Sequence, residues 1–80
     1  MKTVTITPTA MKSLRDIPKH DRTTIIAKLE AYAIGQRQDV VRLKGLTSLR
    51  LRHGDWRVIF DETATTIDVL MISHRREAYR

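Results

Sequence analysis

The first segment of the chain alternates apolar and polar side chains. Over residues 2–7, Val4 and Ile6 fall on one side of an extended backbone, and threonines and a lysine fall on the other. Most of these residues are β-branched, and β-branched side chains favour strands. The pattern therefore predicts a strand with one buried face.

Two segments with helical spacing follow. Thr7 can cap the first helix, and Pro8 suits its first position because the missing N–H would be unpaired there anyway. Pro18 ends this helix. Asp21 is expected to cap the second helix, and Gly35 to end it in the left-handed conformation. The expected apolar stripes are Ala10, Leu14 and Ile17 in the first helix, and Ile25, Ile26, Leu29 and Ala33 in the second.

The second half of the chain has the pattern of strands. Residues 40–43 are extended, and residues 47–60 alternate on both sides of a His53-Gly54-Asp55 turn, in which Gly54 supplies a positive φ. Residues 67–72 form the most apolar segment, so we expect them to be a central strand. The hairpin residues expected to face the helices are Leu49, Leu51, Trp56, Val58 and Phe60.

The order of these elements predicts the fold class. Helices followed by strands joined through hairpins are typical of an α+β domain. We expect one domain over residues 1–80, in which a helical hairpin packs on one face of a mainly antiparallel four-stranded sheet, in the order β-α-α-β-β-β. A single pair of helices covers one face of the sheet and leaves the other open.

Arginines are expected on the open face. If the apolar positions of the hairpin face the helices, Arg50, Arg52 and Arg57 point outward together from adjacent strands. Like charges opposite one another destabilise a strand pair, so the arrangement favours an anionic ligand. The alternative is that these arginines pair with nearby acids, namely Asp55, Asp61, Glu62 and Asp68.

Composition narrows the class of partner and compartment. Lys and Arg number 15 against 9 Asp and Glu, which gives a net charge of +6. This excess favours a polyanionic partner, although it also fits simple solubility. The chain has no cysteine, which excludes a disulfide, a thiolate metal site and a thiol nucleophile. We see neither a membrane-spanning run nor a signal peptide, and we expect a cytoplasmic protein without membrane contact.

The segment 74–80 gathers residues that suit RNA chemistry. His74, Arg75, Arg76, Tyr79 and Arg80 lie within seven positions. Metal-free RNA cleavage proceeds by attack of the ribose 2′-OH on the adjacent phosphate, and it needs a base, an acid and cations near the developing charge. The planar arginine fork matches phosphate oxygens. The three histidines lack metal-ligand spacing and the three glycines form no phosphate loop, so we expect no metal and no cofactor.

Three stretches carry a resemblance to a known family. Residues 43–45 read LKG, residues 49–60 read LRLRHGDWRVIF, and residues 72–80 read ISHRREAYR. In this order they resemble the RelE/ParE superfamily of bacterial and archaeal toxins over nearly the whole chain, and the HRREAYR ending is similar to the RelE branch. The resemblance implies the toxin of a type II toxin–antitoxin system, acting as a ribosome-dependent mRNA interferase. This is a metal-independent endoribonuclease (a hydrolase by class) that inhibits translation. Two alternatives are a ParE-like DNA gyrase inhibitor without nuclease activity and an inactive relative that only binds its antitoxin.

The resemblance also implies roles for individual residues. Tyr79 matches a catalytic tyrosine that serves as base or stacks on a nucleobase, and Arg57 matches an arginine that contacts the scissile phosphate and serves as acid. Arg50 matches a residue that stabilises the transition state, Arg75 (or Arg76) matches the arginine before the tyrosine, and His74 is a candidate proton carrier. The expected RNA-binding residues are Arg52, Arg76, Lys44 and Arg80.

The implied partners are a cognate antitoxin, acidic or amphipathic in character, and the ribosome with its mRNA. Operator DNA is expected to be bound only through the antitoxin complex. Two departures from the family pattern are visible. The sequence stops one residue after Tyr79 and lacks the C-terminal helix of some members, and Ser48 stands where some members carry a basic residue. Both departures are expected to weaken nuclease activity without abolishing it.

Overall fold

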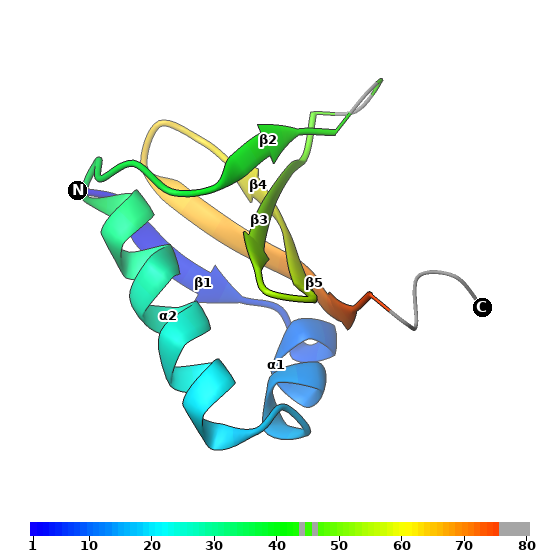
Figure 1. Ribbon diagram of the computed structural model, residues 1–80. Helices are drawn as coiled ribbons and strands as arrows, with labels where there is room; N and C mark the ends of the chain where they lie inside the picture. Colours follow the sequence, from blue (N-terminus) through cyan, green and yellow to red (C-terminus); the bar gives the residue numbers. More distant parts are fainter. Residues whose placement is uncertain (44, 46, 76–80) are drawn as a thin grey trace.

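The computed structural model describes residues 1–43, 45 and 47–75 (Figure 1). Within them, the two helices lie on one side of a sheet and leave its other side open (Figure 1). The elements are β1 (Thr3–Ile6), α1 (Pro8–Arg15), α2 (Lys19–Ala33), β2 (Val40–Arg42), β3 (Leu49–His53), β4 (Trp56–Glu62) and β5 (Thr66–His74). The predicted α+β class and the packing of a helical hairpin on one sheet face are confirmed.

The sheet is mixed and has the strand order β1-β5-β4-β3-β2. β1 runs parallel to β5, and the other neighbouring strands are antiparallel. The predicted count of four strands is wrong, because the described part of the chain forms a five-stranded sheet. The additional strand is β2, an edge strand of 3 residues, which is too short to show a period of two. β5 lies between β1 and β4, in agreement with its apolar sequence.

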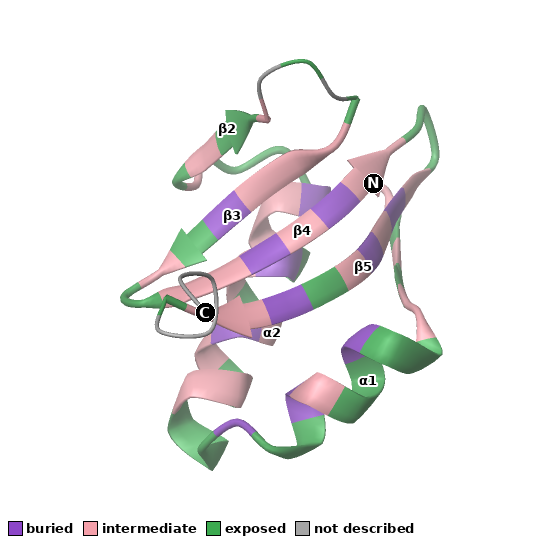
Figure 2. Ribbon diagram, turned by 90° about the vertical axis from the view of Figure 1, so that its right-hand side faces the viewer, coloured by how far each residue is buried: buried purple, intermediate pink, exposed green. Residues whose placement is uncertain are grey.

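The pleat of the sheet separates apolar from charged side chains. Leu51, Val58 and Phe60 are fully buried on the helix side, and the residues between them face the open side. Figure 2 shows this alternation as bands of different burial along β3, β4 and β5. A bulge interrupts it where the pairing of Ile59 with Met71 gives way to that of Phe60 with Val69. The extra residue between Met71 and Val69 keeps both ends of β5 in register with the core.

α1 begins as the sequence predicts. The Thr7 hydroxyl accepts a hydrogen bond from the backbone N–H of Ala10 at 3.2 Å, and Pro8 occupies the first turn. α2 begins at Lys19, so the prediction that Asp21 caps it is wrong. Pro18 takes the cap position with φ −51°, and Asp21 lies in the first helical turn instead.

The end of α2 is closed by a left-handed glycine, as predicted. Gly35 has φ +92°. The N–H of Gly35 donates to the carbonyl of Tyr32 at 3.0 Å, and the N–H of Gln36 donates to that of Ala31 at 2.9 Å. This pair of bonds is a Schellman motif, which satisfies carbonyls that the helix end leaves unpaired.

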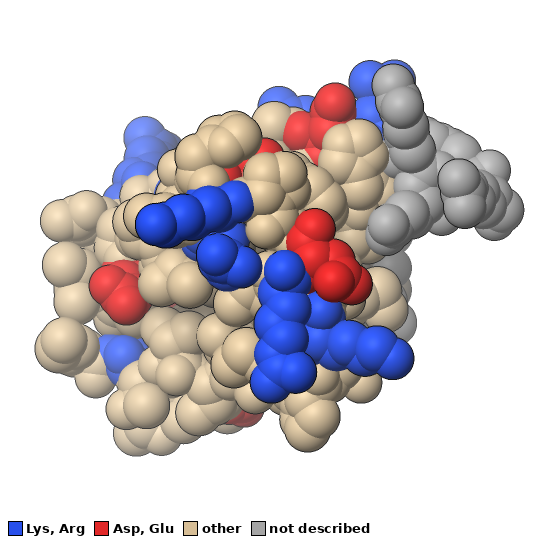
Figure 3. Space-filling model, turned by 90° about the horizontal axis from the view of Figure 1, so that it is seen from below, with Lys and Arg blue, Asp and Glu red and all other residues tan. Residues whose placement is uncertain are grey.

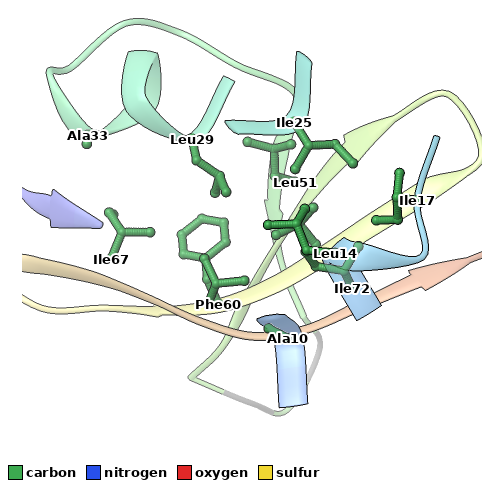
Figure 4. Close-up of a cluster of buried hydrophobic side chains, with 12 residues drawn as sticks. Ala10, Leu14, Ile17, Ile25, Leu29, Ala33, Leu51, Phe60, Ile67 and Ile72 are labelled. Atoms are coloured by element: carbon green, nitrogen blue, oxygen red, sulfur yellow. The ribbon is translucent and has the colours of Figure 1, made fainter. Parts of the chain in front are cut away.

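The core lies between the helices and the sheet (Figure 4). All residues of the predicted α1 stripe are buried, and so are three of the four in α2, with Ile26 partly buried. The rings of Tyr32 and Phe60 meet edge to face at 5.4 Å between centroids. The buried apolar residues are Ala10, Leu14, Ile17, Ile25, Leu29, Ala33, Leu51, Val58, Phe60, Ile67, Val69 and Ile72.

A polar network at the edge of this core joins the residue just before β1 to β4 and α2. The Lys2 ammonium forms an ion pair with Glu62, and the Tyr32 hydroxyl donates to the same carboxylate at 2.8 Å. The bond from Lys2 lowers the pKa of Glu62 most, partial burial opposes it, and the Tyr32 bond lowers it further. Burial and the Glu62 carboxylate raise the pKa of Tyr32.

The burial pattern predicts that truncating two isoleucines in or next to α2 lowers the stability of the fold by different amounts. Ile25 is 0% exposed and Ile34, just after α2, is 53% exposed. We expect Ile25→Ala to lower the free energy of unfolding by about 2–5 kcal/mol, as for buried aliphatic truncations, and Ile34→Ala by less than about 1 kcal/mol. Urea unfolding followed by circular dichroism measures both. Equal losses would contradict the packing of α2 on the sheet.

The Glu62 network predicts part of the acid sensitivity of the fold. Because the folded pKa of Glu62 lies below the unfolded value of about 4.3, its stabilising contribution is present above that pH and is lost as pH falls through the folded pKa. Glu62→Gln should therefore flatten the fall of the unfolding free energy below about pH 4.3. Glu30→Gln, at an exposed position of α2, is the control and should leave the wild-type slope.

Candidate functional site

Three predicted arginines share the open face of the sheet. Arg52 of β3 lies directly opposite Arg57 of β4, and Arg50 lies opposite Ile59 on the same strand pair. Adjacent strands stand about 4.8 Å apart, so the roots of the Arg52 and Arg57 side chains are close neighbours. Of the three arginines that the pleat of the hairpin predicts together, the structure places Arg52 and Arg57 directly opposite each other.

A small hollow opens beside this pair. It has a volume of about 220 Å³ and is lined by Arg52, Gly54, Asp55, Arg57 and Arg75. Arg75 follows the end of β5, and its backbone N–H donates to the carbonyl of Asp55 in the hairpin turn at 2.6 Å. Three arginines from β3, β4 and the end of β5 therefore border one concave, mainly polar site.

Several acids that the alternative interpretation assigned to these arginines have other partners. Asp61 accepts from Ser48 at 2.7 Å, Asp68 accepts from the Thr5 hydroxyl, and Glu62 pairs with Lys2. Each of these three acids therefore has at least one partner other than an arginine of the hairpin.

Arg52 nevertheless has an acidic neighbour that the sequence did not suggest. Its Nε lies 3.2 Å from an Asp39 carboxylate oxygen, and the two side chains are 60% and 56% exposed. Exposed pairs of this kind contribute little stability, with a median near 0–1 kcal/mol. Asp39 is therefore a counter-ion that a stronger anion can displace.

Arg50 occupies a different position from the other two arginines. It is paired with Val41 on β2 and with Ile59 on β4, and it does not line the hollow. Its Nε is buried without a hydrogen-bond partner among the described residues. A buried hydrogen-bond donor without an acceptor lowers stability. The Arg50 side chain is therefore expected to change its position when an acceptor binds nearby.

His74 does not join the arginines. It pairs with Trp56 across β4 and β5, and the two rings meet edge to face at 4.8 Å between centroids. Trp56 packs against the core, so the imidazole of His74 lies on the helix side of the sheet. The remaining predicted residues, namely Lys44, Arg76, Tyr79 and Arg80, lie outside the described residues.

Sequence reasoning missed a polar cluster behind the hairpin turn. Asp21 and Lys28 of α2 meet His53 at the end of β3. The hydrogen bond from His53 is the main cause that lowers the pKa of Asp21; partial burial opposes it, and His20 and the Trp56 indole lower it further. These residues lie far apart in sequence, and no spacing rule links a helix start to a hairpin 32 positions later.

In the part of the chain that the structure describes, no group of three or more His, Cys, Asp or Glu side chains is arranged to hold a metal ion. No helix within it has the length and apolar character needed to cross a membrane.

Positive charge is also present away from the hollow. Lys and Arg side chains form two groups, with carboxylates near them, at the end of the molecule where α1 and α2 are joined (Figure 3). Lys12 and Arg15 in the last turn of α1 belong to the positive charge of the helical layer. The hollow differs from such helix-borne charge because its arginines converge from three separate segments of chain.

Comparison with known families places the chain. A family model described as the ParE toxin of the type II toxin–antitoxin system parDE matches residues 4–79, nearly the full length. The chain belongs to the ParE toxin family. This match confirms the predicted RelE/ParE superfamily. The matching family is the ParE branch, which was the alternative to the expected RelE branch. A search of curated proteins found no match.

Solved structures similar to the toxin come from bacteria and archaea. The RelB–RelE complex of Methanococcus jannaschii matches with a TM-score of 0.81 and 24% identity, covering 94% of each chain. The intact RelBE complex of E. coli matches with a TM-score of 0.77 and 16% identity, covering 92% of this chain and 96% of that one. The YoeB dimer of Staphylococcus aureus gives 0.73 and 16%, covering 91% and 95%. At these identities the similarity establishes the fold.

The hollow predicts that anions stabilise the toxin. Inorganic phosphate bound among Arg52, Arg57 and Arg75 offsets their mutual repulsion and binds only the folded chain. At constant ionic strength, saturating phosphate should raise the melting temperature by roughly 5 °C, and Arg57→Gln should remove most of that rise.

Arg15→Gln is the control for this experiment, because Arg15 is exposed on α1 and its substitution removes the same charge. It should leave the phosphate response at the wild-type level. An equal loss of response in both variants would show that phosphate acts on net charge and not at the hollow.

Proposed function

We propose that this toxin is a metal-independent endoribonuclease that cuts mRNA on the translating ribosome in the cytoplasm. The observation that carries the proposal is the convergence of Arg52, Arg57 and Arg75 on one hollow at the hairpin turn. Guanidinium groups from three segments match the several oxygens of one phosphodiester better than a single exposed arginine does. The resemblance of the chain ending to the RelE branch supports the same assignment.

The proposed reaction is an internal transesterification. The ribose 2′-oxygen attacks the adjacent phosphorus, so an O–P bond forms there while the bond from phosphorus to the 5′ oxygen breaks. The 2′-OH gives its proton to a base, and the leaving 5′ oxygen receives one from an acid. Negative charge grows on the phosphorane oxygens between these events. Fixed cations lower the barrier most when they point at that charge.

The roles follow from position and resemblance together. Arg52, Arg57 and Arg75 bind the phosphate oxygens, and Arg57 gives the proton to the 5′ oxygen. By resemblance, Tyr79 takes the proton from the 2′-OH. Arg50 joins at the transition state. His74 has no part in the proton transfer, because its ring lies against Trp56 on the helix side.

The partners follow from the same proposal. The ribosome presents the mRNA to the hollow. A cognate antitoxin neutralises the toxin by covering the basic face with an acidic or amphipathic segment. The similar M. jannaschii and E. coli structures are antitoxin–toxin complexes. In the same proposal, operator DNA is bound only through the complex of this toxin with its antitoxin.

A second candidate function is inhibition of DNA gyrase without nuclease activity. The observation that favours it is the description of the matching family as the ParE toxin. A gyrase inhibitor acts by covering a protein surface, so it requires basic and apolar area but no group that transfers protons. The two functions therefore differ in their dependence on single side chains.

Induction in cells separates the two. For the nuclease we expect arrest of translation and mRNA cuts at fixed positions within codons. Arg57→Ala and Tyr79→Phe should each lower cutting by at least about 100-fold, the scale seen when one group that stabilises a transition state is removed, while both proteins stay folded and bind antitoxin.

DNA breaks and filamentous cells, with intact mRNA, would instead establish the gyrase inhibitor. Arg15→Gln on α1 is the matched control, because it removes a charge of the same kind from a residue that does not line the hollow and should keep full toxicity. Full toxicity in both Arg57→Ala and Tyr79→Phe would refute the proposed site.

A further inference from the structure

Three side chains on the helix side of the sheet form a connected polar group directly behind the hairpin turn. His53 lies at the end of β3, and its Nε2 is 3.0 Å from a carboxylate oxygen of Asp21. Its Nδ1 is 3.2 Å from the ammonium of Lys28. Both partners belong to α2. We call Asp21, Lys28 and His53 the histidine clamp.

The contacts of the clamp assign one tautomer to His53. A lysine ammonium donates hydrogen bonds and accepts none, so Nδ1 of His53 must be the acceptor. The ring proton is then on Nε2, which donates to Asp21. Each nitrogen therefore has one suitable partner, and the ring has one favoured orientation. The side chains of His53 and Asp21 are only 20% exposed, so water competes weakly for these bonds.

The clamp acts on both ends of the hairpin turn. His53 pairs with Trp56 across β3 and β4, and Gly54 and Asp55 form the turn between them. Trp56 is also among the groups that lower the pKa of Asp21, so both residues that bracket the turn act on one carboxylate of α2. Gly54 has φ +57°, which restricts the conformations through which the turn closes.

The hairpin turn also contacts the segment that follows β5. The Asp55 carbonyl accepts the backbone N–H of Arg75 at 2.6 Å. Trp56 also contacts the ring of His74, the residue before Arg75. A shift of the turn therefore moves the attachment point of Arg75, one of the three arginines around the hollow.

We propose that Asp21, Lys28 and His53 are positioning residues, which fix the hairpin turn from behind and so hold Arg75 beside Arg52 and Arg57. The clamp touches no substrate; its effect passes through the Asp55 carbonyl. The inference rests on the proposed function only in taking the hollow as the site for RNA phosphate. A site held by packed elements is more exact than one carried by a loose loop, and the clamp supplies that support.

The test compares variants that break different bonds between α2 and the sheet. Asp21→Ala leaves His53 without its acceptor, and Asp21→Asn restores an acceptor oxygen in the same place. Tyr32→Phe is the matched control, since it removes the bond from α2 to Glu62 at the far end of the same helix. Lys28→Met removes the other half of the clamp and provides a milder variant if Asp21→Ala does not fold.

Two readouts report on position and not on overall stability. The first is hydrogen exchange of the Arg75 amide by NMR, taken relative to the amide of Val58 in the central strand. The second is the affinity for inorganic phosphate, by titration of the same NMR signals. We expect Asp21→Ala to speed relative exchange at Arg75 and to weaken phosphate binding, each about five- to tenfold, the factor for one typical net hydrogen bond.

The other variants complete the pattern. Asp21→Asn should recover most of both losses, Lys28→Met should show a smaller loss, and Tyr32→Phe should change neither ratio by more than about twofold. Unchanged relative exchange at Arg75 in folded Asp21→Ala and Lys28→Met would overturn the positioning role, whatever their toxicity. So would equal effects in Tyr32→Phe.

The toxicity of the same variants tests the proposed function separately. A loosened Arg75 and weakened phosphate binding with full mRNA cutting would support the clamp and refute the hollow as the reaction site. Loss of cutting in step with loss of phosphate affinity would support both.

Discussion

The pleat of the β3–β4 hairpin is the constraint on which the site depends. Leu51 and Val58 are completely buried against the helices, and successive side chains of a strand point to opposite faces. Burying them therefore sends Arg50, Arg52 and Arg57 to the open face. A slip of one residue would exchange the two sets and place guanidinium groups in an apolar core, where unpaired charges are very costly. The force that fixes the core thus also gathers the arginines.

The acids on the same strands are held where they do not cancel this charge. Asp61 and Glu62 stand at the far end of β4 from Arg57, about 13 Å or more along the strand. Ser48 holds Asp61 on the open face, and Lys2 holds Glu62 on the helix side. A polyanion that approaches the hairpin turn therefore meets Arg52 and Arg57 while these two acids stand at the other end of β4.

Local chemistry made much of the fold predictable. The Thr7 cap and the left-handed Gly35 depend on neighbours within four residues, and both are present in the structure. Residues 40–43 were expected to be extended but were not counted as a strand of the sheet, because three residues carry no period and only the pairing of β2 with β3 defines the strand. Asp21 has the composition of a helix cap, but Pro18 precedes it with a fixed φ and begins the helix earlier.

The residues of the candidate site also differ in how far the sequence predicts their positions. Arg52 and Arg57 were predictable because the alternation of a hairpin is a local property. The position of His74 was not, since it depends on the register of β5 against β4 and on the bulge at Leu70 that shifts this register. The histidine clamp could not be predicted from the sequence for a similar reason, because His53 contacts Asp21 only when the helical hairpin packs on the sheet. Long-range packing decides which polar side chains meet.

The two candidate functions make different demands on the open face. An inhibitor that covers a partner protein needs broad contact, on the order of 800 Å² on each side, and tolerates small displacements of any one side chain. Phosphate transfer needs cations fixed to within a fraction of an ångström, because a misplacement of about 1 Å has a large effect on rate. The hollow of about 220 Å³ is small, and the turn that borders it is held from behind by the clamp. A compact and supported hollow is what the proposed nuclease requires, whereas the description of the matching family is what supports the gyrase inhibitor.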